Sequence, residues 1–325
     1  SVRNSVKLES IYKMKGPLFY SKILLFGEYG IIKDSKGLSI PYNFFKGALK
    51  TDDNPSEEAK KSNKSLEKFS AYLEELSNSQ PKLISFDLKA LKQDIALGMY
   101  FDSSIPQGYG VGSSGALVAA IYHKYAFNKI TVLENLTREK LLSLKTIFGK
   151  MESFFHGKSS GLDPLNSYLS LPILINSKNN IESTSIPSQN FEGKGAVFLL
   201  DSGIIGETAP MVQIFMEQMK NNGFRKMLKD QFIKHTDACV EDFVSGNVKS
   251  LFGNLKQLSN VVLDNFKPMI PAKFHKLWKQ GIDTNEYYLK LCGSGGGGYI
   301  LGFTEDLEKA KKALKDHKLE VVYNF

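Results

Sequence analysis

A loop rich in glycine and serine, Pro106-Gln-Gly-Tyr-Gly-Val-Gly-Ser-Ser-Gly-Ala116, opens an apolar segment that ends at Tyr125. Gly108, Gly110 and Gly112 allow positive φ angles and a close approach of the backbone to a ligand. Successive N–H groups of such a loop can converge on phosphate oxygens, and a following helix adds its positive N-terminal end. The loop therefore indicates a phosphate site, or alternatively a tight turn before a buried helix.

The spacing within this loop excludes two common nucleotide-binding motifs. No Gly-Lys-Ser/Thr follows the glycines, so the Walker A pattern is absent. The loop is also too rich in serine, and lacks the βαβ context, for the dinucleotide-binding fingerprint. Ser113 and Ser114 lie where a hydroxyl could cap the helix or reach a metal ion bound to phosphates.

A second glycine run, Gly293-Ser-Gly-Gly-Gly-Gly298, lies between two expected strands, 287–292 and 299–303. A hairpin needs only one or two glycines, and four in succession weaken it. This weakening indicates that a ligand or another backbone approaches closely, with a flexible hairpin loop as the alternative. Two unrelated glycine loops in one chain favour a nucleotide site.

The remaining sequence predicts an α+β fold, in which helices collect on one face of mixed or antiparallel sheets. The alternating apolar residues of 85–104 predict paired strands. Other expected strands cover 18–26, 38–46, 171–175, 196–201 and 319–323, and expected helices cover 51–80, 116–125, 138–155, 207–263 and 305–317.

Two boundaries follow from polar stretches of the chain. Residues 177–192 are polar and include turn-forming residues, which indicates a lobe boundary there. We therefore expect an N-terminal lobe at 16–183 and a C-terminal lobe at 184–325. Residues 1–15 are polar and basic without an apolar core, so we expect a disordered leader, with Met14 near the natural start.

Composition excludes several classes of protein. The 325 residues are 42% hydrophobic and contain no apolar run of the roughly 20 residues that cross a membrane. The net charge of +8 is scattered and lacks the aromatic–basic interleaving typical of nucleic-acid binding. Cys239 and Cys292 are far apart, which predicts reduced thiols in a cytoplasmic protein. The five histidines show no zinc-binding spacing.

Three charged residues stand where phosphoryl transfer could use them, and each also has an ordinary structural interpretation. This reaction needs neutralised charge, an aligned acceptor oxygen and a place for the acceptor proton. Glu152 is a candidate Mg²⁺ ligand or an exposed helix charge. Asp163 precedes a proline, so it could cap a helix and still project into a cleft. Lys22 is a candidate for neutralising negative charge in the reaction, or an ordinary lysine at the edge of a strand.

Taken together, three segments resemble the motifs of the GHMP kinases, which include galactokinase, homoserine kinase, mevalonate kinase and phosphomevalonate kinase. Pro106 to Ser114 resembles their phosphate-binding motif. Tyr20 to Tyr29 is similar to the first motif, usually Pro-Gly-Lys, an apolar strand and Gly-Glu-His, and Lys290 to Gly298 is similar to the third. The resemblance covers roughly 16–325 and implies a ribosomal-protein-S5-like N-terminal lobe and a ferredoxin-like C-terminal lobe.

Within this family, the string Glu152-x-x-x-His156-Gly-x-x-Ser160-Gly-x-Asp163 most resembles the mevalonate kinases. The resemblance implies ATP and Mg²⁺ as cofactors, with the metal on Ser114 and Glu152. It implies that Asp163 is the catalytic base for the C5 hydroxyl of mevalonate, with Lys22 beside it, in isoprenoid precursor synthesis. It further assigns the nucleotide phosphates to Pro106, Gly108, Gly110, Gly112, Ser113 and Ser114, and the acceptor to Glu28, Tyr29, Thr208, Gly295, Gly296 and Gly297.

Two departures from the family pattern leave alternatives open. Tyr20-Ser21 replaces the usual Pro-Gly, and Tyr29 replaces the usual His. Gly-Glu-Tyr is also common in phosphomevalonate kinases, although these generally lack the string that ends at Asp163. We therefore favour mevalonate, with phosphomevalonate or another small molecule as the alternative, and less favour a non-catalytic ligand-sensing protein. The expected partners are small molecules rather than nucleic acid or membrane, in a monomer or homodimer.

Overall fold

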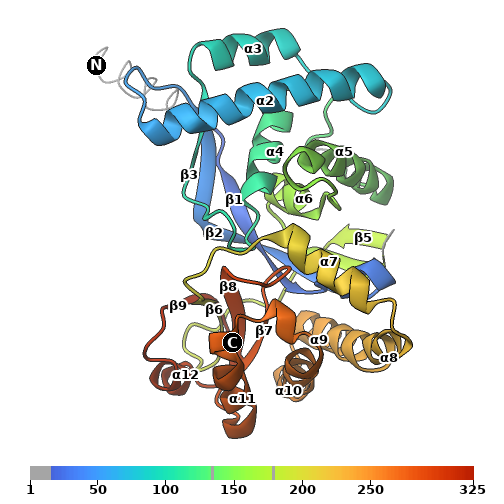
Figure 1. Cartoon of the computed structure of the whole chain (residues 1–325), viewed down its shortest axis with the longest axis vertical. Helices are drawn as coiled ribbons and strands as arrows, with labels where there is room; N and C mark the ends of the chain where they lie inside the picture. The colour runs from blue at the N-terminus through green and yellow to red at the C-terminus, as the bar shows by residue number, and fades with distance from the viewer. Residues whose placement is uncertain (1–15, 133–134, 178–179) are drawn as a thin grey trace. The chain divides into compact units, whose positions relative to one another are not determined.

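The structure, a computed structural model, describes residues 16–132, 135–177 and 180–325 (Figure 1). The expected leader at 1–15 lies outside the described residues. The first elements in chain order are β1 (Phe19–Phe26), the 3₁₀ turn η1 (Gly30–Lys33), β2 (Gly37–Lys50), α2 (Glu57–Ser79), α3 (Leu88–Ala96), β3 (Tyr100–Ser103), α4 (Ser113–Tyr125), α5 (Arg138–His156), α6 (Leu162–Leu169), β4 (Ile173–Ser177) and β5 (Asn180–Ser183).

The remaining elements are mainly helical. They are β6 (Ala196–Asp201), α7 (Thr208–Gln218), α8 (Asn222–Met227), the π-helical turn η2 (Leu228–Ile233), α9 (Lys234–Ser245), α10 (Val248–Asn265), the 3₁₀ turns η3 (Lys267–Met269) and η4 (Ala272–Phe274), α11 (His275–Thr284), β7 (Tyr288–Leu291), β8 (Tyr299–Thr304), α12 (Leu307–Ala313) and β9 (Leu319–Asn324). Outside 85–104, each expected strand or helical region is present with shifted ends. β5 and α11 were not predicted, and α6 was anticipated only as a helix that Asp163 could cap.

Two sheets confirm the predicted α+β fold. The first has the order β1-β2-β4-β5, and β3 pairs with β2 in addition. β2 is antiparallel to β4, with Leu38 opposite Leu174, and to β3, with Ala48 opposite Asp102. The second sheet has the antiparallel order β7-β8-β6-β9. Its central strand β6 is an unbroken apolar run with Ala196–Leu200 buried, as expected for a strand covered on both faces.

The described chain divides into two compact units. Unit 1 takes residues up to Lys22, Pro41–Pro106 and Gly112–Ser170, and unit 2 takes Ile23–Ile40, Gln107–Val111 and Leu171–Phe325. Both units are discontinuous in sequence because β1, β2 and the glycine loop each contribute residues to both. The continuous lobes expected from the sequence, 16–183 and 184–325, stay a prediction about the family domains.

In unit 1, three helices pack tightly together and position the predicted catalytic residues. α4 contacts α5 and α6, and α5 contacts α6, so α4 can be apolar around most of its circumference (Figure 1). Tyr122, Phe148 and Tyr168, one from each helix, meet edge to face with ring centroids 5.0–5.4 Å apart. This shared core holds the first turn of α4 against the first turn of α6.

One segment of unit 1 differs from its prediction. The paired strands expected at 85–104 are wrong over Leu88–Ala96, which forms α3, and only Tyr100–Ser103 is a strand. The side chain of Asp87 accepts a hydrogen bond from the N–H of Ala90 (3.1 Å) and so caps the helix. Leu91 and Ile95, four residues apart, form its buried face. The cap and this spacing together outweigh the local alternation.

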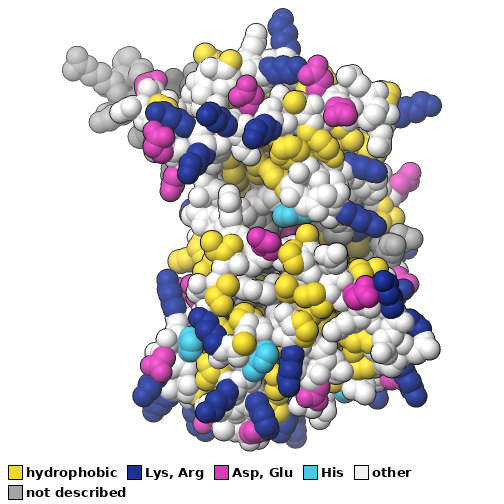
Figure 2. Space-filling view, in the orientation of Figure 1, with side chains coloured by type: hydrophobic (Ala, Val, Ile, Leu, Met, Phe, Trp, Pro, Cys, Tyr) yellow, Lys and Arg dark blue, Asp and Glu magenta, His cyan; other side chains and the backbone are white. Residues whose placement is uncertain are grey.

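The surface carries charges of both signs (Figure 2), and the two cysteines are buried. On the face drawn in Figure 2, Lys and Arg side chains are spread among Asp and Glu side chains. None of the described helices is both long enough and apolar enough to span a bilayer. Cys239 and Cys292 are both buried free thiols.

Two helical glycines provide a test of the close packing between α4 and α6. A Cβ at Gly115 would lie 2.8 Å from the carbonyl carbon of Asp163 and from the nitrogen of Pro164, whereas a Cβ at Gly253 in α10 would meet nothing within 4 Å. We expect Gly115→Ala to lower the free energy of unfolding by about 1–3 kcal/mol through overpacking. Gly253→Ala should raise it by roughly 0.5–1 kcal/mol through helix propensity. Urea unfolding measures both, and equal changes in the two variants would contradict the close approach.

Candidate active site

Four predicted site residues from separate parts of unit 1 meet at the first turn of α4. They are Lys22 in β1, Ser114 in α4, Glu152 in α5 and Asp163 in α6, and we call them the α4 cluster. Two bonded pairs make up this group, Lys22 with Asp163 and Ser114 with Glu152. The two carboxylates also interact electrostatically, since the charge of Asp163 acts on Glu152. The predicted meeting of these four residues is therefore present in the fold.

The first pair is a partly buried ion pair. Nζ of Lys22 lies 2.8 Å from Oδ1 of Asp163, and the side chains are 6% and 38% exposed. The lysine side chain runs past the start of α4, where a Cβ at Gly112 would lie 3.1 Å from its Cγ. Gly112 also has φ 84° and ψ 40°, a left-handed conformation that favours glycine. The last glycine of the loop thus makes room for the lysine.

The structure corrects the prediction that Asp163 caps a helix. A cap at Asp163 would start the helix at Pro164, but α6 begins two residues earlier, at Leu162, and its N-cap is Gly161, which offers no side chain. Asp163 lies in the first turn instead, where a negative charge is favoured by the helix dipole. Its carboxylate binds Lys22, so the aspartate is used outside its own helix.

The second pair is buried and hydrogen-bonded. Oγ of Ser114 donates to Oε2 of Glu152 (2.9 Å) and lies 2.8 Å from Nε2 of His156. The hydroxyl of Ser159 donates to the other carboxylate oxygen of Glu152. Glu152 is only 3% exposed, so the prediction of an exposed helix charge is wrong. Ser114 does not cap α4, because the N-cap is Gly112.

The electrostatics of Glu152 follow from this burial. Desolvation first, and the negative charge of Asp163 second, raise the pKa of Glu152 to about 7, against the lowering effects of the two serine hydroxyls and Lys22. The carboxylate is therefore short of positive charge in the ligand-free protein. A cation bound beside it would offset that deficit.

The start of α4 is also a ready anion site. No side chain caps the helix, and the N–H groups of its first turn, from Ser113 onward, carry the positive end of the helix dipole. Ser113 itself is half-buried, as is Pro106 at the beginning of the loop. A phosphate at this turn would lie beside the ammonium group of Lys22 and the hydroxyl of Ser114.

The donor set fits Mg²⁺ delivered with a nucleotide. Among residues 16–132, 135–177 and 180–325, no group of three or more His, Cys, Asp or Glu side chains could hold a metal ion. Mg²⁺ typically uses one or two carboxylates together with phosphate oxygens and water. Glu152 supplies a carboxylate short of positive charge, and Ser114 supplies a hydroxyl 2.9 Å from it. These residues suit a metal that the phosphates help to bind.

In unit 2, the two glycine loops pack against each other. A Cβ at Gly110 would lie 2.6 Å from the carbonyl oxygen of Cys292, and one at Gly298 would lie 2.4 Å from Cα of Tyr109. The N–H of Gly206 donates to the carbonyl of Gly108 (2.9 Å). The close backbone approach predicted for the 293–298 run is confirmed, and the approaching backbone is that of the other glycine loop.

Predicted acceptor residues also come together in unit 2. The hydroxyl of Tyr29 donates to the carbonyl oxygen of Ser294, and Oγ of Ser294 lies 3.5 Å from Oγ1 of Thr208. A Cβ at Gly296 would lie 2.8 Å from the sulfur of Met211 in α7. Tyr29, Thr208 and the loop containing Gly295, Gly296 and Gly297 therefore form one cluster.

Glu28 has a different environment from the other predicted acceptor residues. Its Oε1 lies 2.7 Å from Nζ of Lys290, and the two side chains are 3% and 2% exposed. Burial raises the pKa of Glu28, and the charge of Lys290 opposes this change. The carboxylate is thus engaged inside unit 2.

Sequence reasoning missed two residues that take part in these clusters. Ser159 lies one position before the Ser160 of the family string, and Lys290 begins the third motif without having been given a role. A buried lysine in an apolar strand was the available signal for Lys290, because such a residue needs a charged partner.

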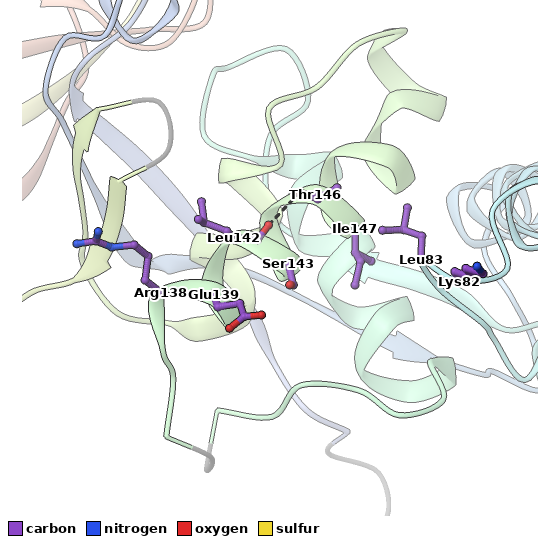
Figure 3. A pocket seen from close by; sticks show the side chains of 8 residues that line it. All are labelled: Lys82, Leu83, Arg138, Glu139, Leu142, Ser143, Thr146 and Ile147. Carbon is purple, nitrogen blue, oxygen red and sulfur yellow. Dashed lines mark hydrogen bonds between the residues drawn. The ribbon is translucent and has the colours of Figure 1, made fainter.

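A hollow of about 670 Å³ lies elsewhere in unit 1 (Figure 3). It is lined by Lys82, Leu83, Arg138, Glu139, Leu142, Ser143, Thr146 and Ile147. The hydroxyl of Thr146 donates to the carbonyl of Leu142 (3.0 Å), which is an ordinary bond within α5. None of the predicted site residues lines this hollow.

Comparison with known proteins agrees with this geometry. The sequence model described as "GHMP kinases N terminal domain" matches residues 82–170, which include the glycine loop, Glu152 and Asp163. This part of the chain is therefore similar to the N-terminal domain of the GHMP kinases. A search of the curated proteins gives no match to it.

Several solved kinase structures share the fold over nearly the whole chain. Mevalonate kinase of L. major, in complex with R-mevalonate, has a TM-score of 0.60 at 18% identity and covers 94% of this chain and 95% of its own. Streptococcus pneumoniae phosphomevalonate kinase, in complex with phosphomevalonate and AMPPNP, gives 0.60 at 14%, covering 94% and 99%. Lactococcus lactis galactokinase, complexed with galactose, gives 0.58 at 13%, covering 100% and 98%. At these identities the likeness concerns the fold.

The raised pKa of Glu152 predicts a stability that depends on pH in this protein. The folded protein keeps a proton on Glu152 from the ordinary pKa of 4.5 up to about 7, whereas the unfolded chain has released it. This contribution to the free energy of unfolding is complete below about pH 4.5 and is lost, by about 3 kcal/mol, as pH rises through about 7.

Urea unfolding of ligand-free protein at about pH 5 and about pH 8 measures this loss. We expect Glu152→Gln to flatten the pH dependence relative to the unsubstituted protein, because other groups cancel in the difference. Glu67→Gln, on the exposed face of α2, is the matched control and should leave the dependence unchanged. An unaltered dependence in Glu152→Gln would contradict the raised pKa.

Proposed function

We propose that this chain is an ATP-dependent kinase that transfers the γ-phosphoryl group to the C5 hydroxyl of mevalonate, giving 5-phosphomevalonate. One observation carries this proposal: the Lys22–Asp163 ion pair of 2.8 Å lies at the uncapped start of α4, beside the bonded Ser114 and Glu152. A base, a cation and an anion-binding helix end together supply what phosphoryl transfer requires.

In this proposal Asp163 accepts the proton of the attacking hydroxyl. The acceptor oxygen forms a bond to the γ-phosphorus, the bond from that phosphorus to the bridging oxygen of ADP breaks, and the hydroxyl proton passes to the carboxylate. Lys22 pairs with Asp163 and stabilises negative charge on the transferring group. The exposure of Asp163, 38%, leaves its second oxygen accessible to a substrate.

The start of α4 and the buried carboxylate would then serve the nucleotide. The N–H groups of Ser113 and Ser114 would bind phosphate oxygens at the positive end of the helix. Glu152 and Ser114 would hold Mg²⁺, which supplies charge neutralisation to the phosphates. The assignments of Pro106, Gly108, Gly110 and Gly112 to this role stay predictions.

Two features bear on the acceptor. Tyr29, in place of the family's usual histidine, favours phosphomevalonate as the second candidate. On the other side, phosphomevalonate kinases generally lack the string from Glu152 to Asp163 that this chain has. We therefore place mevalonate first.

An acceptor assay tests this choice. ADP release is measured with MgATP and either mevalonate or phosphomevalonate, and we expect the higher kcat/KM with mevalonate. Higher kcat/KM with phosphomevalonate would change the acceptor but keep the kinase. Release of ADP with neither of these acceptors, nor with homoserine or galactose, would overturn the proposed function.

The role of Asp163 gives a second test. Asp163→Asn keeps the size of the side chain but cannot take the proton, so we expect kcat to fall by about 10²–10⁴-fold while nucleotide affinity changes little. The matched control is Asp102→Asn, which breaks the exposed ion pair with Lys50 (2.6 Å) elsewhere in unit 1 and should leave kcat unchanged. Near-normal turnover of Asp163→Asn would remove the base assignment.

The role of Glu152 predicts a pH-dependent metal requirement. Protonation below about pH 7 removes the charge that would bind Mg²⁺. We expect the Mg²⁺ concentration for half-maximal activity to rise roughly tenfold per pH unit below that value, because one proton competes with the metal. The measurement is a Mg²⁺ titration of turnover at several pH values. A requirement that does not change between about pH 5.5 and pH 7 would contradict a metal role for Glu152.

A further inference from the structure

The turn after β1 is joined at two points to β7 and the glycine loop that follows it. The hydroxyl of Tyr29 donates to the carbonyl oxygen of Ser294, and Glu28 pairs with Lys290 at 2.7 Å. We propose that Tyr29 and the Glu28–Lys290 pair are positioning residues, which hold the 293–298 loop in the conformation that receives the acceptor. Only the statement that the loop receives an acceptor rests on the proposed function. The two connections themselves lie within unit 2.

The packing of Tyr29 fixes its ring and directs its hydroxyl to one partner. Its side chain lies against Phe215 and Phe266, with ring centroids 4.7 and 5.9 Å away, and the residue is 7% exposed. Its backbone has φ 60°, a conformation that non-glycine residues rarely adopt. Burial, and then the charge of Glu28, raise the pKa of Tyr29, so the hydroxyl remains a donor. The ring is fixed, and its hydroxyl acts on Ser294.

The hydrogen bond to Ser294 has a consequence for the next residue. The carbonyl of Ser294 and the N–H of Gly295 belong to one planar peptide group. Because Tyr29 holds the carbonyl oxygen, it also fixes the direction of the Gly295 N–H. A loop with five glycines has many other conformations available, so a single fixed peptide group restricts it strongly.

The ion pair holds the strand end from which the loop leaves. Nζ of Lys290 binds Oε1 of Glu28 and also donates to the carbonyl of Leu291 (3.0 Å), two residues before the loop. Oε2 of Glu28 is buried without a hydrogen-bond partner among the described residues. A buried ion pair with an unsatisfied oxygen is a weak source of stability, and a role in fixing register is the better-attested use of such pairs.

Together these contacts indicate the way in which Tyr29 acts on catalysis. Thr208 approaches the same loop from α7, with its Oγ1 3.5 Å from Oγ of Ser294, and the N–H of Gly296 donates to Met269 (2.6 Å). The loop is therefore held from several sides, and the bond from Tyr29 is the one that sets the Ser294–Gly295 peptide. Tyr29 acts through this peptide rather than by contact with the acceptor.

Hydrogen exchange of ligand-free protein tests the tyrosine. Tyr29→Phe keeps the packed ring and removes only the hydroxyl, so we expect the amides of 293–298 to exchange roughly fivefold faster while those of β6 do not change. Tyr288→Phe is the matched control. Tyr288 lies in β7, the strand that leads to the loop, but its hydroxyl donates to Asn285 (2.9 Å). Unchanged exchange in the loop, or equal acceleration in β6, would overturn the inference.

The ion pair has its own test. The double variant Glu28→Gln with Lys290→Met removes both charges, so neither is left buried alone. We expect a cooperative unfolding transition together with exchange in 293–298 that is several-fold faster than in the unsubstituted protein. Loop exchange that stays at the original rate would exclude the ion pair as a positioning element.

Kinetics distinguish positioning from direct recognition. Tyr29→His keeps an aromatic ring but is too short to reach Ser294, so we expect kcat/KM to fall by the same factor for mevalonate and phosphomevalonate, with nucleotide affinity unchanged. A changed ratio between the acceptors would show direct contact and overturn the inference. Because exchange is measured without substrates, a chain inactive on all acceptors would refute the proposed function but leave this inference standing.

Discussion

The close contact between the first turn of α4 and the first turn of α6 is the constraint on which the candidate site depends. With no side chain at Gly115, α4 packs directly on the backbone between Asp163 and Pro164. This contact brings the aspartate to the helix end that also carries Ser114. Lys22, passing beside Gly112, then lies within ion-pair distance of the aspartate. The lack of side chains at Gly112 and Gly115 thus allows the close packing that brings the three functional side chains together.

Burial gives the charged groups of this protein different properties in its two units. In unit 1 the carboxylate of Glu152 is buried with two serine hydroxyls as partners, and desolvation together with the charge of Asp163 raises its pKa to about 7. In unit 2 the carboxylate of Glu28 is buried with Lys290 as a partner. The first arrangement favours binding of an external cation, whereas the second supports structure.

Several features of this chain follow from short-range sequence patterns. The glycine loop with the helix after it, the helix expected at 51–80 and the strand expected at 196–201 were all predicted, because each depends on neighbours a few residues away. The errors arose where a local pattern was ambiguous. The alternation in 85–104 concealed the capped helix α3, and Asp163 followed by proline resembled a helix cap although the cap of α6 is Gly161, two residues earlier.

The amino-acid sequence was enough to predict the fold class, the two glycine loops and, through the family resemblance, that Lys22, Ser114, Glu152 and Asp163 should meet. The surroundings of the buried charges became visible in the folded protein: Glu152 is buried with two serine partners, and Lys290 pairs with Glu28. The physical reason is range. Turn and helix preferences act over a few residues, whereas desolvation and ion pairing depend on which segments fill the space around a charge, and those segments lie up to 262 positions apart, the separation of Lys290 from Glu28.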